Sequence, residues 1–190
     1  MEAARRLFER DGYAATSMPA IAAEARVAVK TVYIAFGTKA GLLRRLWDQR
    51  LAGDEAATPV LERTWYREVA DDEAPEGKLR LVARQSRAVK TRSGSLLEVI
   101  RNAASVDPEM ADLWRDIATK LHQVARAVIA QLQEANAVRP DLDPATAADM
   151  LWALGHPAVW QLLVRERGWT PERYEQWLED VLRSQLLEHR

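Results

Sequence analysis

Polar and basic side chains recur within residues 17–39, whose sequence is SMPAIAAEARVAVKTVYIAFGTK. Six of them could bind phosphate oxygens or base edges: Ser17, Lys30, Thr31, Tyr33, Thr38 and Lys39. Ser17 and Thr38 are expected at helix N-termini, where free N–H groups and the helix dipole favour an anion. Ala28 and Val29 lie among them and could contact thymine methyl groups. This segment therefore has the chemistry of a surface for double-stranded DNA.

The apolar spacing of the same segment predicts two short helices joined by a tight turn, with another helix following at once. Thr16 and Ser17 are both favourable N-caps for the first of these, and the next runs from about Val29 to Ala35. Gly37 then breaks the chain and Thr38 can cap the following helix. We expect one small core formed by Ile21, Ala22, Ala25, Val27, Val32, Tyr33 and Phe36. This pattern predicts a helix-turn-helix.

Charge is distributed unevenly along the 190 residues. Residues 1–52 contain nine Lys and Arg against five Asp and Glu, a net charge of +4, whereas the remainder carries −5. A basic amino-terminal part on an acidic body fits a nucleic-acid module joined to another domain, although the excess is modest enough to arise by chance. The chain has no cysteine, which excludes disulfides and thiolate metal sites. No apolar run reaches the length of a membrane span and no signal-peptide pattern opens the chain, so we expect a cytoplasmic protein without a membrane partner.

The remaining sequence shows helical periodicity throughout and no alternating strand pattern. We expect an all-α protein in which a small three-helix module with the helix-turn-helix occupies residues 1–52, and a larger helical bundle occupies residues 53–190. Ser93-Gly94-Ser95 predicts a break or kink, and Glu109 to Ala135 is expected to be the longest helix.

The spacing of residues 3–47 resembles the DNA-binding domain of the TetR family of transcriptional regulators. The resemblance rests on Ala4, Leu7, Phe8, Gly12, Tyr13, Thr16, Ile21, Ala22, Ala25, Val27, Thr31, Val32, Tyr33, Phe36, Lys39 and Leu42. It implies a ligand-responsive regulator, most often a repressor, that binds a palindromic operator as a homodimer and leaves it when a small, largely apolar effector binds. Beyond residue 47 the resemblance is one of architecture only.

Three features depart from that family pattern. Arg26 stands in the turn where members usually have glycine, and Ala28 stands at an N-cap that is usually serine or threonine. The sequence also begins inside the first helix, where members usually carry a longer lead-in. These departures keep open an alternative, an all-α dimeric ligand-binding or interaction protein with weakened DNA binding.

The helical body offers candidates for an effector site. Around Ala118 and His122, small side chains next to a polar group could leave space for a ligand, with Trp114 on the same stripe. Other walls could come from Trp65, Tyr66, Leu97, Arg101, Trp152 and His156. A lone histidine in a helix stripe is more often an ordinary core or surface residue, and His156 could simply shape the bend between Gly155 and Pro157.

Two apolar stripes near the carboxyl end are candidates for a dimer interface, because two helical hairpins could form a four-helix bundle. Their members include Trp160, Leu163, Tyr174, Trp177, Leu178, Val181 and Leu182. We favour the dimer over the alternative, in which the stripes pack only within one chain. The sequence contains no phosphate-binding loop, nucleophile elbow or paired-histidine metal spacing, so we expect neither an enzyme nor a bound cofactor or metal.

Overall fold

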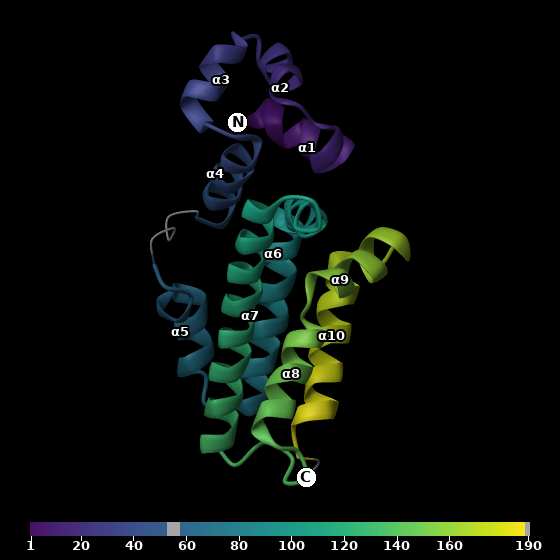
Figure 1. Cartoon of the computed structure of the whole chain (residues 1–190). Coiled ribbons are helices and arrows are strands. Elements are labelled where there is room, and N and C mark those ends of the chain that lie inside the picture. Colours follow the sequence, from purple (N-terminus) through teal and green to yellow (C-terminus); the bar gives the residue numbers. More distant parts are fainter. Residues whose placement is uncertain (53–57, 189–190) are drawn as a thin grey trace. The chain divides into compact units, whose positions relative to one another are not determined.

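The computed structural model describes residues 1–52 and 58–188, which are almost entirely helical (Figure 1). The helices are α1 (Glu2–Ala15), α2 (Met18–Ala25), α3 (Val29–Phe36), α4 (Lys39–Ala52), the 3-10 helix η2 (Val60–Glu62), α5 (Thr64–Asp71), α6 (Pro75–Ala103), α7 (Pro108–Glu134), α8 (Pro144–Leu154), α9 (Pro157–Trp160), the π-helix η3 (Gln161–Glu166) and α10 (Pro171–Leu186). The described residues contain no strand, only an isolated bridge between Val138 and Leu187. The all-α prediction is confirmed.

The chain divides into two compact units that are not contiguous in sequence. The first comprises residues 1–57 and 93–117, and the second comprises residues 58–92 and 118–190. Helices α6 and α7 therefore each contribute to both units. This division differs from the boundary expected after residue 52, which stays a prediction about the functional domains.

In the first unit, the core joins the four amino-terminal helices to the 93–117 segment. Phe8, Leu42 and Leu43 are fully buried there together with Ile100 and Met110. Gly12 adopts a φ of 77° within α1, so this helix is kinked at Gly12 before one more helical turn. The first unit is thus a helix-turn-helix module whose core is completed by parts of α6 and α7.

The caps of α2 and α4 follow the sequence prediction. The Ser17 hydroxyl accepts a hydrogen bond from the Ala20 N–H at 3.2 Å, and the Thr38 hydroxyl accepts one from the Gly41 N–H at 2.8 Å. Each bond satisfies one of the N–H groups that a helix start leaves without an intrahelical partner.

Arg26 closes α2 in the left-handed conformation, with φ 55° and ψ 44°. The Arg26 N–H donates to the Ala23 carbonyl and the Val27 N–H to the Ala22 carbonyl, which together form a Schellman motif. A side chain other than glycine costs about 1 kcal/mol in this conformation. Ala28 then begins α3 without a side-chain cap, which typically costs about 1 kcal/mol. Both departures from the family pattern are real features of the fold.

In the second unit, the core gathers apolar side chains from α5 to α10. Among those wholly buried are Leu79, Val128, Leu132, Tyr174 and Leu178. Asp143 caps α8 by accepting hydrogen bonds from the Ala145 and Thr146 N–H groups. Figure 1 shows α8 and α10 side by side, as their contacts require.

The predicted break at Ser93-Gly94-Ser95 is wrong, because α6 runs without interruption from Pro75 to Ala103. A glycine inside a helix costs about 1 kcal/mol relative to alanine. The buried residues Leu96, Leu97 and Ile100 follow directly on the same helix, and their burial outweighs that cost. The predicted bounds of Glu109 to Ala135 are close, since α7 spans Pro108–Glu134, but α7 is not the longest helix, because α6 has 29 residues and α7 has 27. None of the described helices is long and apolar enough to cross a membrane.

Candidate nucleic-acid interface and ligand region

Helix α3 buries one narrow side and exposes the rest. Val32 is 4% exposed and Phe36 packs partly buried against the core. Large side chains are exposed on the other sides: Val29, Lys30, Tyr33 and Ile34, and Val27 is exposed in the turn before the helix. Soluble proteins seldom concentrate exposed apolar side chains on one short helix unless that helix meets a partner. The face is the right size and shape for one helix in a major groove.

The predicted inward packing of this segment is only partly correct. Ala25 is exposed, and Val27 and Tyr33 are 44% and 48% exposed, so they do not join the small core. Ile21, Ala22 and Val32 are buried as expected. For Tyr33 the reason is the helical repeat. Residues 33 and 34 follow the buried Val32 by one and two positions, so their side chains point away from the side of α3 that packs on the core.

The other predicted DNA-contact residues are also at the surface. Ser17, Ala28, Lys30, Thr31 and Thr38 are all exposed. Lys30 makes no ion pair with any described residue, so its ammonium group is available to a phosphate or a guanine edge.

Lys39 has a structural role that the sequence did not reveal. Its ammonium group donates to the Tyr13 carbonyl at 2.8 Å and to the Thr16 carbonyl at 3.0 Å, and it lies 4.2 Å from the centre of the Tyr13 ring. The side chain therefore ties the end of α1 to the start of α4. Two of its three N–H donors are already used, which leaves one for a phosphate.

Tyr13 connects α1 to the start of α7. Its hydroxyl donates to the Asp107 carboxylate, which also caps α7 by accepting from the Glu109 N–H at 3.0 Å. Burial raises the pKa of Tyr13, and the hydrogen bond to the negative carboxylate raises it further. The hydroxyl therefore stays protonated and keeps donating to Asp107 throughout the physiological range.

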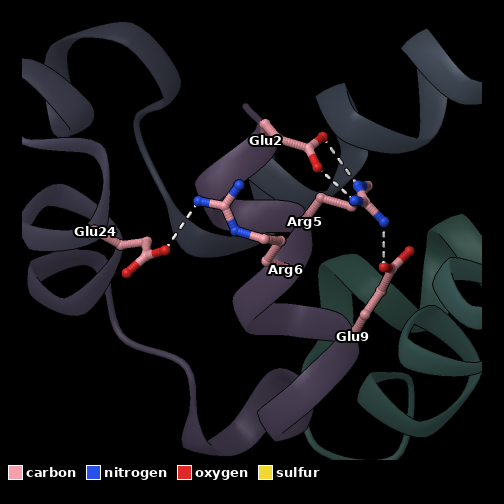
Figure 2. A network of polar contacts seen from close by, with 5 residues as sticks. All are labelled: Glu2, Arg5, Arg6, Glu9 and Glu24. Atoms are coloured by element: carbon pink, nitrogen blue, oxygen red, sulfur yellow. Dashed lines mark hydrogen bonds and ion pairs between the residues drawn. The ribbon is translucent and has the colours of Figure 1, made fainter.

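Ion pairs engage the arginines of α1. Figure 2 shows Arg5 between Glu2 and Glu9, and Arg6 directed at Glu24 of α2, with 2.9 Å between the Arg6 Nη2 and Glu24 Oε1 atoms. Arg10 pairs with Asp11 at 2.7 Å. Part of the positive charge that the sequence places in residues 1–52 is thus balanced locally.

Three of the predicted effector residues lie together in the second unit. Trp152 meets His122 and His156 edge-on, with ring centres 6.2 Å and 5.2 Å apart. The His122 Nε2 atom lies 2.9 Å from the Asp149 carboxylate, and the Trp152 indole N–H is buried without a hydrogen-bond partner. His156 accepts from the Ala158 N–H through Nδ1 and so caps α9 directly after the bend.

The remaining effector candidates are distributed over both units. Tyr66 is buried in the core of the second unit, where its hydroxyl accepts from the Gln131 amide at 3.0 Å, and Trp65 packs edge-on against it. Ala118 belongs to the same unit. Leu97, Arg101 and Trp114 belong to the first unit, where Leu97 is in the core and Arg101 approaches Glu98 at 4.0 Å.

Most of the predicted dimer stripe is buried within a single chain. Trp160, Tyr174, Leu178 and Leu182 are at most 3% exposed. Leu163, Trp177 and Val181 remain half-buried. The four buried side chains therefore stabilise the protomer itself. Of the predicted stripe, only the three half-buried side chains retain exposed area that a partner could cover.

A buried lysine that sequence reasoning missed lies at the centre of the second unit. Lys90 is 5% exposed, and its ammonium group donates to the Gly155 carbonyl at 2.7 Å, to the Tyr174 hydroxyl at 3.0 Å and to the Ser86 hydroxyl. No carboxylate of a described residue pairs with it. Burial lowers the pKa of Lys90 to about 7 and raises that of Tyr174 to about 12.

Comparison with known proteins decides the family. Residues 1–46 match the family described as bacterial regulatory proteins, tetR family, and residues 75–187 match the carboxy-terminal domain of BetI-type transcriptional repressors. The chain belongs to the TetR family of bacterial regulatory proteins. This TetR-family chain has no sequence match among curated proteins.

Solved structures share the fold of this TetR-family regulator over almost its whole length. NalD, the secondary repressor of the MexAB-OprM multidrug efflux pump in Pseudomonas aeruginosa, is 18% identical with a TM-score of 0.76, covering 100% of this chain and 94% of NalD. A transcriptional regulator from Saccharomonospora viridis in complex with choline is 22% identical with a TM-score of 0.74, covering 99% of this chain and 95% of that regulator. FadR from Bacillus subtilis in complex with stearoyl-CoA is 17% identical with a TM-score of 0.74, covering 96% of this chain and 95% of FadR. At these identities the likeness establishes the fold.

The family and these structural neighbours are transcriptional regulators. Within residues 1–52 and 58–188, no three His, Cys, Asp or Glu side chains are grouped so that they could hold a metal ion. Its family membership makes the chain a DNA-binding, TetR-family transcriptional regulator, as its helix-turn-helix segment predicted.

Proposed function

We propose that this protein is a repressor that binds a palindromic operator as a homodimer and is released by a small, largely apolar effector. The observation that carries the proposal is the exposed face of α3, where Val29, Tyr33 and Ile34 are 40%, 48% and 75% exposed beside Lys30. Burial in a DNA groove accounts for that exposure, and family membership supports the same surface.

The test begins with an operator selected by the wild-type protein from a library of random duplexes. Fluorescence anisotropy with the selected duplex should show salt-sensitive binding, because phosphate contacts release counterions. The Lys30→Ala, Tyr33→Ala double variant should bind at least about tenfold more weakly, since it loses one charge and one large contact at the groove. If the library yields no enriched sequence even at low salt, the regulator function is refuted for this chain.

A palindromic operator requires two helix-turn-helix modules about 34 Å apart, so we propose a homodimer. The half-buried side chains Leu163, Trp177 and Val181 are the proposed contacts, because they retain surface for a partner to cover. Sedimentation velocity at micromolar concentration should show a dimer. A monomer under those conditions contradicts the proposal.

The proposed effector region surrounds Trp152, His122 and His156, where aromatic rings and a buried indole N–H without a partner lie together. Choline and stearoyl-CoA, bound by two structural neighbours, are suitable first probes because they differ in charge and apolar area. An effector should weaken duplex binding, and by linkage the duplex should weaken effector binding by the same factor. Trp152→Ala should reduce the effector's influence without changing duplex affinity in its absence. We place the protein in the cytoplasm, where such an operator is accessible.

One further candidate function has a specific observation in its favour. The left-handed Arg26 and the uncapped start of α3 both weaken the local fold of the DNA module. They favour an all-α ligand-binding or interaction protein with reduced DNA binding. The same anisotropy titration distinguishes the two functions, because such a protein would bind selected and scrambled duplexes equally weakly.

A further inference from the structure

Arg26 occupies a backbone conformation that the chain elsewhere gives to glycine or asparagine. Five described residues have positive φ, and the other four are Gly12, Gly37, Gly168 and Asn136. Glycine has no Cβ to clash in this region, and asparagine tolerates it well. Arginine has neither advantage, so Arg26 is the one strained member of the set.

The end of α7 is an internal comparison for the end of α2. There the Asn136 N–H donates to Gln133 and the Ala137 N–H to Leu132, the same pair of hydrogen bonds that Arg26 and its successor form. The two helices thus end in the same motif, and α7 uses a residue suited to it. The motif itself does not require arginine, and the side chain of Arg26 must be explained in another way.

The Arg26 side chain is exposed and makes no ion pair with a described residue. Glu24 is only two positions away, but its carboxylate pairs with Arg6 instead (Figure 2). The guanidinium therefore has no counter-charge of its own in the turn between α2 and α3. An exposed, unpaired arginine with five donors in a planar fork suits a phosphate group.

Helix α3 itself offers little charge for DNA. Lys30 is the only charged residue between Val29 and Phe36, whereas phosphate contacts supply much of the affinity of DNA-binding proteins. Arg26 lies two residues before Ala28, at the end of α3 that leads into the groove in helix-turn-helix proteins. We propose that Arg26 binds a DNA phosphate beside α3, and that the strained turn is retained for this contact. The inference rests on the DNA binding proposed above.

Three variants of Arg26 separate its charge from its backbone strain. Arg26→Asn removes the charge and relieves the strain, because asparagine tolerates positive φ. Arg26→Gly also removes both, because glycine has no Cβ. Arg26→Lys keeps the charge and the strain. Arg126→Gln is the matched control, because Arg126 is an exposed arginine of the second unit without an ion pair to a described residue. Each protein is titrated with the duplex selected by the wild type, at several salt concentrations, and its thermal unfolding is recorded.

We expect Arg26→Asn and Arg26→Gly to unfold about 2–4 °C higher than the wild type and yet to bind the duplex about five- to tenfold more weakly. The slope of log affinity against log salt should fall by about 2, which is one phosphate contact per subunit of a dimer. Arg26→Lys should keep most of the slope, and Arg126→Gln should keep both affinity and slope.

Gains in thermal stability with unchanged affinity and slope would overturn the role of Arg26 while leaving the proposed function intact. Loss of affinity in Arg26→Lys equal to that in Arg26→Asn would also overturn it, because the effect would then not depend on charge. A wild-type protein that selects no duplex refutes both the proposed function and this contact.

Discussion

Replacing Lys90 by methionine should remove a pH dependence of stability that the wild-type protein shows in mildly alkaline solution. The Lys90 ammonium group is buried and donates hydrogen bonds to hydroxyl and carbonyl oxygens. Burial lowers its pKa in the folded chain from 10.5 to about 7. Between these values the unfolded chain binds about one more proton than the folded chain. The free energy of unfolding must therefore increase as the pH rises through this window.

The size of this increase follows from the two pKa values. Between about pH 7.5 and pH 9.5 the titration of Lys90 adds about 2–3 kcal/mol to the free energy of unfolding. The facing groups do not obscure it: Tyr174 has its pKa raised to about 12, and Arg87 forms an ion pair with Glu175. A neutral amine can also keep its place, because it still has two N–H donors and can accept from the Tyr174 hydroxyl.

The assay is urea unfolding followed by tryptophan fluorescence at fixed protein concentration and several pH values. Wild type should gain stability over the window, whereas Lys90→Met should show a much flatter profile and should exceed the wild type most at the acidic end. Lys120→Met, which removes an exposed lysine of the same unit, should keep the wild-type slope. Parallel profiles for wild type and Lys90→Met would refute the conclusion that this lysine is buried without a counter-charge.

Other substitutions test the contacts of single side chains by the same unfolding assay. Tyr13→Phe should cost about 1–2 kcal/mol, because the Asp107 carboxylate loses a buried donor; an unchanged midpoint would mean that the bond is not formed. Lys39→Met should cost about 2 kcal/mol through the two carbonyls that it leaves without a donor, whereas Lys30→Met should change stability by less than about 0.5 kcal/mol; equal effects would contradict the structural role of Lys39. His156→Ala should cost about 1 kcal/mol as the cap of α9 is lost, and a His156→Asn variant that fails to restore it would argue against capping.

The sequence predicted the helix-turn-helix well because its signals are local. Ser17 and Thr38 cap helices through N–H groups three residues away, and such contacts are visible in the spacing of residue types. The left-handed turn at Arg26 was also open to prediction, because the family pattern places glycine there. The exposure of Tyr33 could not be predicted, because the sequence of a mostly apolar helix does not show which of its sides packs on the core.

Contacts with backbone atoms from distant segments explain most of what sequence analysis missed. Lys39 binds carbonyls of Tyr13 and Thr16, and any residue type at those two positions would present the same acceptors. In the carboxy-terminal part, the apolar spacing of Tyr174 and Leu178 correctly indicated burial, but spacing does not distinguish packing within a chain from packing between chains.

For Lys90 a signal was present but not used. Ser86 and Lys90 fall in the heptad-spaced series that includes Leu79, Ala83 and Leu97, so both were on the apolar side of α6. A lysine in such a series predicts either a local break in the core or a buried amine with polar acceptors. The structure shows the buried amine. Its acceptors, the hydroxyl of Tyr174 and the carbonyl of Gly155, come from distant parts of the chain.

The unbroken course of α6 has a consequence for how this protein can change over evolution. Leu79 and Ala83 on this helix belong to one core, and Leu96 and Ile100 belong to the other. One residue inserted or deleted inside either pair would turn one of its members by about 100° about the helix axis, away from the core that the pair shares. Related chains should therefore vary in length within connections such as 136–143, while the four-residue spacing within each pair stays fixed.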